Sequence, residues 1–501
     1  MNFRSVFYVL GWILRIEAAL LLLPAAIGGL YHEWQAAMYL VVSAVCLLLG
    51  VLLSLKKPKH IRFFAKEGYM ITALSWIVMS LFGCLPFMLT GEIPSFVDAY
   101  FEMVSGFTTT GASIVPNVEL LSRSTNLWRC FSHWIGGMGV LVFLLAVLPM
   151  VGGSNMHLMR AESPGPSVGK LVPKMRYTAQ TLYLLYFLLT IAEFVLLMLA
   201  RMHPYEALCA AFGTAGTGGF GVRADSMASY SPAIQWIVTC FMLLFGVNFN
   251  VYFLLYVRRF RDALRCEEMR AYFAIVAAAT LLICLNTYNR AITLEGNVRE
   301  AAFQVASIIT TTGYATADFD RWPELSRLLL VLIMFVGACA GSTGGGLKVS
   351  RFMIAGKALR NNMRSFLHPR EVRSIHFEGK RVEEGTIRAI FVYFFAVTMI
   401  FFASTLLLSL DNKDLVTTVS AVSATFNNIG PGLGEAGPTS CYAGFSSLSK
   451  LVMIFDMLAG RLEVFPMLVL FYPPMWKGVF ELSVTQRRSR AHDRQPVSGQ
   501  G

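Results

Sequence analysis

The chain has 501 residues, of which 55% are hydrophobic and only 14% are charged. Soluble proteins carry about 25% charged residues, so a soluble fold of this size would leave a large apolar surface in water. The composition therefore excludes an ordinary soluble protein and indicates one that crosses a membrane several times. The net charge of +12 would suggest nucleic acid as a partner of a soluble protein, but in a membrane protein the loop positions of the charges decide their meaning.

Ten apolar stretches are long enough to span a bilayer, since a spanning helix needs about 20 residues. They cover 6–30, 36–55, 69–90, 129–151, 180–201, 232–256, 269–287, 324–357, 387–409 and 446–475. The first two are separated by a few polar residues and predict a tight helix hairpin. The eighth is too long for one span and is interrupted by Gly-Ser-Thr-Gly-Gly-Gly at 341–346. A break at membrane depth is tolerated where protein covers it or where it lines a wet cavity.

The loop charges predict the orientation of the chain. Most of the 42 Lys and Arg residues lie on the side that also carries both chain ends, if the number of spans is even. Because basic loops stay in the cytoplasm, both termini are predicted to be cytoplasmic. The basic surplus then reflects membrane topology, so we expect contact with the lipid bilayer and none with nucleic acid. The opposite side carries half of the 30 acidic residues, which either favour cations at an outer mouth or merely solvate the loops.

An internal repeat follows the N-terminal hairpin. The remaining eight spans form four pairs, and a re-entrant loop joins the two members of each pair. The loops end in Thr-Thr-Gly-Ala-Ser (109–113), Thr-Gly-Gly-Phe-Gly (217–221), Thr-Thr-Gly-Tyr-Ala (311–315) and Asn-Ile-Gly-Pro-Gly (428–432). We refer to them as filter segments 1 to 4. A candidate half-helix precedes each segment, at 95–107, 204–215, 298–310 and 413–426, with Pro94, Pro204 and Asp411 near three of the starts.

The predicted fold is an all-α polytopic membrane protein with four pseudo-symmetric helix–pore loop–helix repeats around one central pore. The predicted divisions are the hairpin at 1–60, the pore repeats at 61–160, 161–260, 261–365 and 366–480, and a cytoplasmic tail at 481–501. The nine cysteines and eight histidines show no metal-ligand spacing, so neither a resident metal nor a covalently bound cofactor is expected.

Four such loops around one axis indicate selection of a monovalent cation. Rings of backbone carbonyls replace the hydration shell of potassium in potassium channels, which are the standard example of this chemistry. Glycine reaches the required backbone angles without steric cost, and the negative C-terminal ends of the half-helices favour a cation. The predicted ion-binding residues are Thr109, Thr110, Gly111, Thr217, Gly218, Gly219, Thr311, Thr312, Gly313, Asn428, Ile429 and Gly430.

Several stretches resemble the TrkH/KtrB superfamily of potassium-uptake proteins. They are Ser-Gly-Phe-Thr-Thr-Thr-Gly-Ala (105–112), His-Trp-Ile-Gly-Gly-Met-Gly (133–139), Ala-Gly-Ser-Thr-Gly-Gly-Gly-Leu-Lys (340–348), Asn-Asn-Ile-Gly-Pro-Gly (427–432) and Gly-Arg-Leu-Glu (460–463). The resemblance covers residues 69–475, and the N-terminal hairpin is similar to that of the TrkH branch.

The resemblance implies potassium uptake across a bacterial inner membrane, with potassium as the transported substrate. It also implies a homodimer and a cytoplasmic nucleotide-binding regulatory subunit of the TrkA/KtrA type. Gly111 implies a preference for potassium, because relatives with serine at this place transport sodium. Filter segment 2 departs from the family pattern through the additional glycines Gly216 and Gly218.

A gate is predicted below the filter segments. The resemblance implies that the break at 341–346 is an intramembrane loop that obstructs the pore; the alternative is a glycine-rich kink for close helix packing. Arg461 has no suitably spaced acidic partner on its own helix. We expect it to face the pore or the loop, or else to form a salt bridge with another helix. The predicted gate residues are Gly341, Ser342, Thr343, Gly344, Gly345, Gly346, Lys348 and Arg461.

The sequence therefore predicts a channel-like potassium-uptake protein and no enzyme. A symporter that couples potassium to sodium or protons is the nearer alternative, and it would need buried acids such as Glu193, Asp456 and Glu463. A membrane-embedded enzyme would need a cluster of acids, histidines or a nucleophile at one membrane face, and the sequence shows none. His133 is predicted to be a packing residue, and Arg15 and Glu17 to make polar contacts between helices.

Overall fold

The structure is a computed structural model, and it describes residues 3–55, 65–139, 175–288, 293–368 and 374–473. These residues form α-helices, short 3₁₀ turns and one antiparallel hairpin of two short strands, β1 (His376–Phe377) and β2 (Lys380–Arg381). Six helices of the described ranges are long and apolar enough to cross a membrane, or seven if one bent helix pair counts as a span. The predicted tail at 481–501 lies outside the described residues.

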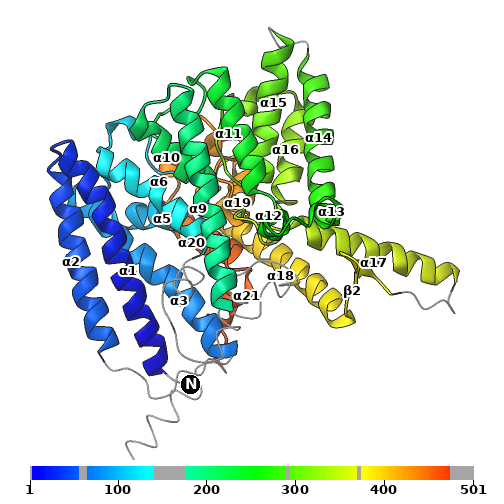
Figure 1. Ribbon diagram of the computed structural model, residues 1–501, viewed down its shortest axis with the longest axis horizontal. Helices are drawn as coiled ribbons and strands as arrows, with labels where there is room; N and C mark the ends of the chain where they lie inside the picture. The colour runs from blue at the N-terminus through cyan, green and yellow to red at the C-terminus, as the bar shows by residue number, and fades with distance from the viewer. Residues whose placement is uncertain (1–2, 56–64, 140–174, 289–292, 369–373, 474–501) are drawn as a thin grey trace, which may run out of the picture.

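The N-terminal hairpin consists of α1 (Phe3–Leu30) and α2 (Gln35–Ser54), which run side by side at one edge of the molecule (Figure 1). Small residues allow this close approach. A side-chain atom added to Gly11 would lie 2.8 Å from the carbonyl oxygen of Gly50, and one added to Gly50 would be equally crowded by α1. The hairpin packs on α3 and α6 of the first repeat, so it is an integral part of the fold.

Each repeat contains a long first helix, a buried half-helix and a second helix. In repeat 1 these are α3 (Ala65–Gly83) extended by α4 (Leu85–Leu89), α5 (Phe96–Phe107) and α6 (Arg123–Gly137). In repeat 2 they are α9 (Met175–Leu199), α10 (Pro204–Ala215) and α11 (Pro232–Phe245) with α12 (Phe249–Tyr256). The short α13 (Phe260–Arg265) leads into repeat 3.

Repeat 3 consists of α14 (Glu267–Thr287), α15 (Leu294–Ile309) and α16 (Glu324–Met334), followed by α17 (Val349–Leu367). Repeat 4 consists of α18 (Glu384–Leu408), α19 (Leu415–Phe426), α20 (Ser447–Arg461) and α21 (Phe465–Leu470). The half-helix α15 lies beside α14 and α16, and α17 and β2 project from the edge opposite the hairpin (Figure 1).

The second helices of repeats 2, 3 and 4 are broken, whereas the sequence predicts a break only at 341–346. The stretch 232–256 is two helices bent by 90° at Gly246–Asn248. The stretch 324–357 is divided into α16 and α17 by an irregular segment, and 446–475 is divided into α20 and α21. Residues 140–151 of the fourth stretch lie outside the described residues. Hydropathy does not detect the breaks at 246–248 and 462–464, because each is short and lies within a long apolar stretch.

The half-helices begin where short polar side chains or proline favour a helix start. His203 and Thr293 accept hydrogen bonds from the backbone N–H groups of Tyr205 and Gly296. The fourth half-helix begins at Leu415 rather than at 413, because Asp414 and not Asp411 is the N-cap. The Thr417 side chain and backbone N–H hold the pKa of the Asp414 carboxyl below its usual range. The third half-helix begins at Leu294 rather than at 298, because Thr293 provides an earlier cap.

Candidate functional site

The four filter segments share one backbone conformation. The second residue after each half-helix has a left-handed φ, namely 54° at Thr109, 53° at Thr217, 59° at Thr311 and 54° at Asn428. Two residues later comes a glycine with positive φ, which is 79° at Gly111, 80° at Gly219, 85° at Gly313 and 94° at Gly430. Threonine adopts a left-handed φ at a cost of about 1–3 kcal/mol. Its occurrence at three equivalent positions shows that the surrounding structure imposes this conformation.

A repeated hydrogen-bond pattern fixes each turn. In segment 1 the N–H groups of Thr109 and Thr110 donate to the carbonyls of Gly106 and Ser105, at 3.1 and 2.9 Å. Segments 2, 3 and 4 make the same pair of bonds to their own half-helices. This is the Schellman arrangement, which normally ends in glycine. It satisfies carbonyls at the helix end while the following residues leave the helix axis.

The glycines bring the four segments together as a closed ring. A side-chain carbon added to Gly111 would overlap the carbonyl oxygen of Gly218. One added to Gly219 would overlap the carbonyl oxygen of Thr312. Gly313 abuts the carbonyl of Ile429 in the same way, and Gly430 abuts that of Thr110. Contacts therefore run from segment 1 to 2, 3, 4 and back to 1. The structure brings all twelve predicted ion-binding residues to this ring.

A cavity of about 280 Å³ lies at one mouth of the ring, and all four glycines line it. The rest of its lining comes from residues that follow the filter segments, among them Ser113, Phe220 and Pro431. Backbone groups from all four repeats thus converge on one solvent-sized space. An ion could approach the carbonyls of the ring through this cavity.

His133 explains the additional glycines of filter segment 2. Its Nε2 accepts a hydrogen bond from the N–H of Phe220 at 3.2 Å, so the ring is neutral and its Nδ1–H donates to the carbonyl of Gly106 at 2.7 Å. A side chain at Gly216 or Gly218 would collide with His133. These glycines therefore make room for a buried histidine that holds segment 2 against α5. The prediction that His133 is a packing residue is confirmed.

A buried ion pair behind segments 1 and 2 was not predicted from the sequence. Glu102 and Arg129 are 0% and 1% exposed, and their side chains meet at 2.7 Å. The second carboxylate oxygen of Glu102 accepts the N–H of Ile114 at 2.9 Å, and the guanidinium lies 4.2 Å from the ring of Phe220. An acid inside an apolar half-helix was the signal that could have revealed the pair.

The glycine loop lies directly against the ring. The N–H of Gly345 donates to the Thr311 hydroxyl at 2.7 Å, and side chains at Gly345 or Gly346 would press on Asn427 and Asn428. The buried Lys348 donates to the carbonyls of Gly344 and Gly345. The loop is therefore folded back on itself and packs against segments 3 and 4.

Arg461 links the loop to the first repeat. Its guanidinium donates to the carbonyl of Thr343 at 2.9 Å, and to the carbonyls of Gly136 and Gly137 at 2.6 and 2.9 Å. The latter two carbonyls end α6, where the helix dipole favours a positive charge. The expectation that Arg461 faces the loop is confirmed. Its predicted position midway along a span is wrong, because α20 ends at Arg461.

The remaining predicted gate residues make contacts around the loop. The Ser342 hydroxyl donates to the carbonyl of Cys339 at 2.6 Å, and the carbonyl of Gly341 accepts the N–H of Phe249 at 3.0 Å. Gly341 and Gly346 have φ values of 72° and 62°, which glycine adopts without strain. The loop thus rests on the break between α11 and α12.

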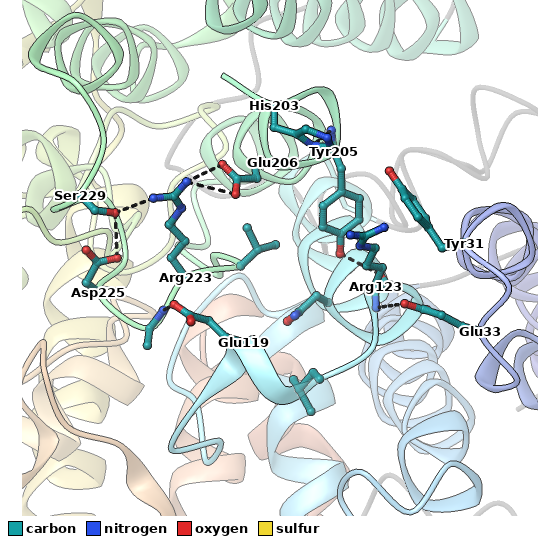
Figure 2. A pocket seen from close by; sticks show the side chains of 14 residues that line it. Tyr31, Glu33, Glu119, Arg123, His203, Tyr205, Glu206, Arg223, Asp225 and Ser229 are labelled. Atoms are coloured by element: carbon teal, nitrogen blue, oxygen red, sulfur yellow. Dashed lines mark hydrogen bonds and ion pairs between the residues drawn. The ribbon is translucent and has the colours of Figure 1, made fainter. Parts of the chain in front are cut away.

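A second, larger pocket of about 1050 Å³ lies between the tip of the hairpin and repeats 1 and 2. Figure 2 shows that its charged side chains bind one another. The Arg223 guanidinium donates hydrogen bonds to Glu206 and to the Ser229 hydroxyl, and that hydroxyl donates to Asp225. The Arg123 guanidinium stacks on the ring of Tyr31 at 3.7 Å. Other acids on this face are also paired, including Asp98 with Lys450 and Asp320 with Arg327. Many acids on this side therefore hold the loops together, which is neither of the two roles considered for them.

Two of the acids that a symporter would need bond to other side chains. Asp456 accepts a hydrogen bond from Ser404 at 2.7 Å, and Glu463 pairs with Arg351. Glu193 is fully buried in α9. Glu17 is also fully buried, but its carboxyl makes no hydrogen bond with any residue that the structure describes, so the predicted polar contact is wrong for Glu17. Arg15 stacks on Trp12 of its own helix at 4.7 Å.

These features define a multi-span helical membrane protein in which four repeats and an N-terminal hairpin surround one central ring of backbone carbonyls. Comparison with known proteins identifies the family of the chain. The family model "TrkH: Cation transport protein" matches residues 37–477, and the chain belongs to this family.

Individual relatives match over almost the whole chain. The Trk system potassium uptake protein TrkH of Escherichia coli K12 is 34% identical over 490 residues, which cover 95% of this chain and 100% of the relative. TrkG of the same organism, also named a Trk system potassium uptake protein, is 30% identical over 482 residues, covering 95% and 99%. The crystal structure of the potassium transporter TrkH from Vibrio parahaemolyticus superposes with a TM-score of 0.85 at 32% identity, covering 95% and 100%. These relatives are transport proteins rather than enzymes.

We expect Arg129→Met to destabilise the protein by about 3–5 kcal/mol, because it leaves the Glu102 carboxylate buried without its partner. The double variant Glu102→Met/Arg129→Met should lose less than the sum of the two single variants. Thermal unfolding of the detergent-purified protein, followed by fluorescence, measures both effects. Arg321→Met is the control, because the Arg321 side chain is 87% exposed. Strictly additive losses would contradict the coupling of the two charges.

Proposed function

We propose that this protein conducts potassium into the cell through the central ring, down the electrochemical gradient of the ion. The observation that carries the proposal is the closed ring of filter segments, in which each glycine abuts a carbonyl of the next segment. Backbone carbonyls in such a ring can replace the hydration oxygens of a monovalent cation. The relatives named as potassium uptake proteins support potassium as the ion, and Gly111 supports a preference for it over sodium.

In this proposal the ion meets two sets of oxygens after it enters the protein. It enters through the 280 Å³ cavity and passes the carbonyls of the filter segments. It then reaches the hydroxyl and amide groups of Thr109, Thr217, Thr311 and Asn428, where the negative ends of the four half-helices also converge. The Thr109 hydroxyl and the Asn428 side-chain oxygen are buried and make no hydrogen bond within the described residues. Both are therefore available to a passing ion.

Passive flow fits the structure better than coupled symport. A symporter needs acids that bind the driving ion along the path, whereas Asp456 and Glu463 bond to Ser404 and Arg351 outside the ring. Transport against the full potassium gradient, driven by sodium or protons, would favour symport instead.

Gly313→Ser should abolish the preference for potassium and lower potassium and rubidium flux by about tenfold or more, because a side chain there overlaps the carbonyl of Ile429. Flux of potassium, rubidium and sodium into liposomes that contain the purified protein measures the change. Gly385→Ser is the matched control, since Gly385 has open space around it. Unchanged ion preference in Gly313→Ser would refute the proposed filter.

We further propose that the glycine loop and Arg461 form the gate. The loop lies against Thr311 and Asn428, and Arg461 ties it to the end of α6 while placing a positive charge below the ring. A charge at this position repels cations, and residues without bulky side chains can change conformation at low cost.

Arg461→Gln should raise potassium flux through the protein alone by about tenfold, because hydrogen bonds to charged groups contribute roughly 1.5–3 kcal/mol each. The liposome assay measures this flux, and the potassium preference should stay unchanged, since the ring is intact. Arg388→Gln, an exposed site on α18, controls for the loss of one positive charge. A decrease in flux, with normal folding, would show that Arg461 does not close the pore.

We also propose that the protein is a homodimer in the bacterial inner membrane, with both termini in the cytoplasm and a nucleotide-binding regulatory subunit beneath it. The relatives carry the name of a Trk system. The projecting helix α17 supports a partner on this face, because it combines basic residues with exposed apolar ones, which are Leu359, Met363, Phe366 and Leu367.

Light scattering after size exclusion in mild detergent should give twice the mass of the 55.5 kDa chain. Phe366→Ser together with Leu367→Ser tests whether α17 contributes, and Leu285→Ser together with Tyr288→Ser on the exposed end of α14 is the control. A monomer for the native protein would contradict the dimer.

A further inference from the structure

One buried carboxylate holds both ends of the glycine loop. Glu268 lies in the first turn of α14 and is 2% exposed. Its Oε1 atom accepts the N–H of Ala340 at 2.7 Å and the N–H of Ser350 at 3.1 Å. Ala340 precedes the loop and Ser350 follows it, so a single oxygen joins two points ten residues apart in the sequence.

These two bonds form the neck of the loop together with one backbone bond. The N–H of Val349 donates to the carbonyl of Ala338 at 3.2 Å. Ser350 also belongs to the first turn of α17, where a carboxylate satisfies free N–H groups and interacts favourably with the helix dipole. Glu268 therefore fixes the start of α17 and the width of the neck at once.

The N-terminus of α14 is in turn held by the β1–β2 hairpin. The Glu378 side chain at the hairpin turn accepts the N–H of Glu268 at 2.9 Å and the thiol of Cys266 at 3.2 Å. Lys357 of α17 bonds to Glu267 and to the carbonyl of His376. The hairpin, the first turn of α14 and α17 thus form one connected unit, and Figure 1 shows β2 and α17 projecting together from the molecule.

We infer that Glu268 is a positioning residue that keeps the neck of the glycine loop closed and transmits to it the position of the β1–β2 hairpin. The inference rests on the proposed role of the loop as the gate. The inference adds a physical path that runs from Glu378 through the first turn of α14 to the loop. Through this path, a partner that moves the hairpin would open or close the neck of the loop.

Glu268→Ala removes the shared acceptor and should raise potassium flux through the purified full-length protein in liposomes by about tenfold. Glu268→Gln keeps an acceptor oxygen at the same place and should stay within about twofold of the native flux. The potassium preference should not change in either variant, because the ring is untouched. Glu384→Ala is the control, since Glu384 is an exposed acid in the first turn of α18.

Glu378→Ala should change flux in the same direction, and the double variant Glu268→Ala/Glu378→Ala should exceed neither single variant by much, since both act through one path. Fully additive increases would show that the hairpin and Glu268 act independently and would overturn the proposed path.

Thiol labelling gives a second measurement that does not depend on flux. Cys339 is fully buried beside the neck, so Glu268→Ala should increase its modification by a small maleimide, measured by peptide mass spectrometry. Cys130, which is buried behind filter segment 2, should remain protected and so reports intact folding. Native-like protection of Cys339 in Glu268→Ala would overturn the inference.

Arg461→Gln separates the two proposals. If Arg461→Gln raises flux while Glu268→Ala changes neither flux nor Cys339 labelling, the gate stands and the role of Glu268 is wrong. If neither variant raises flux but Glu268→Ala exposes Cys339, Glu268 closes the neck and the loop is not the gate.

Discussion

The close approach of four backbone segments is the constraint on which the rest of the structure depends. Each filter glycine lies so near to a carbonyl of the next segment that no side chain fits between them. Peptide carbonyls repel one another at short range and are expensive to bury unpaired. The ring is therefore stable only if the surrounding protein holds every segment from behind.

The support behind the ring differs between the repeats, although the backbone conformation is the same. Segment 1 is held by the buried Glu102–Arg129 pair, and segment 2 by the neutral His133. Segment 4 is tied through Asn428, whose side-chain amide donates to the Thr110 hydroxyl and the carbonyl of Met457 at 2.9 Å each. The same backbone conformation in the four segments is thus supported by different side chains in each repeat. This inequality lets the glycine loop attach to one side of the ring only, at segments 3 and 4.

The glycine loop is likewise held by close contacts to its backbone. It touches Thr311, is closed by Lys348, rests on Arg461 and is held at its neck by Glu268. Each contact uses a backbone group of the loop rather than a side chain. A segment held in this way can be released by moving its partners, without repacking a hydrophobic core. That property suits a gate, and it connects the ring to the β1–β2 hairpin on the far side of α14.

The sequence by itself determined the helical membrane class, the N-terminal hairpin, the four half-helices to within a few residues and the positions of the four filter segments. These follow from local properties, namely runs of apolar residues, capping residues and glycines at equivalent places. The breaks at 246–248 and 462–464, the burial of Arg129 and the contacts of Glu268 and Glu378 emerge only in the folded chain. These depend on residues that lie far apart in the chain and on a charge meeting its partner in space, which hydropathy and local spacing cannot encode.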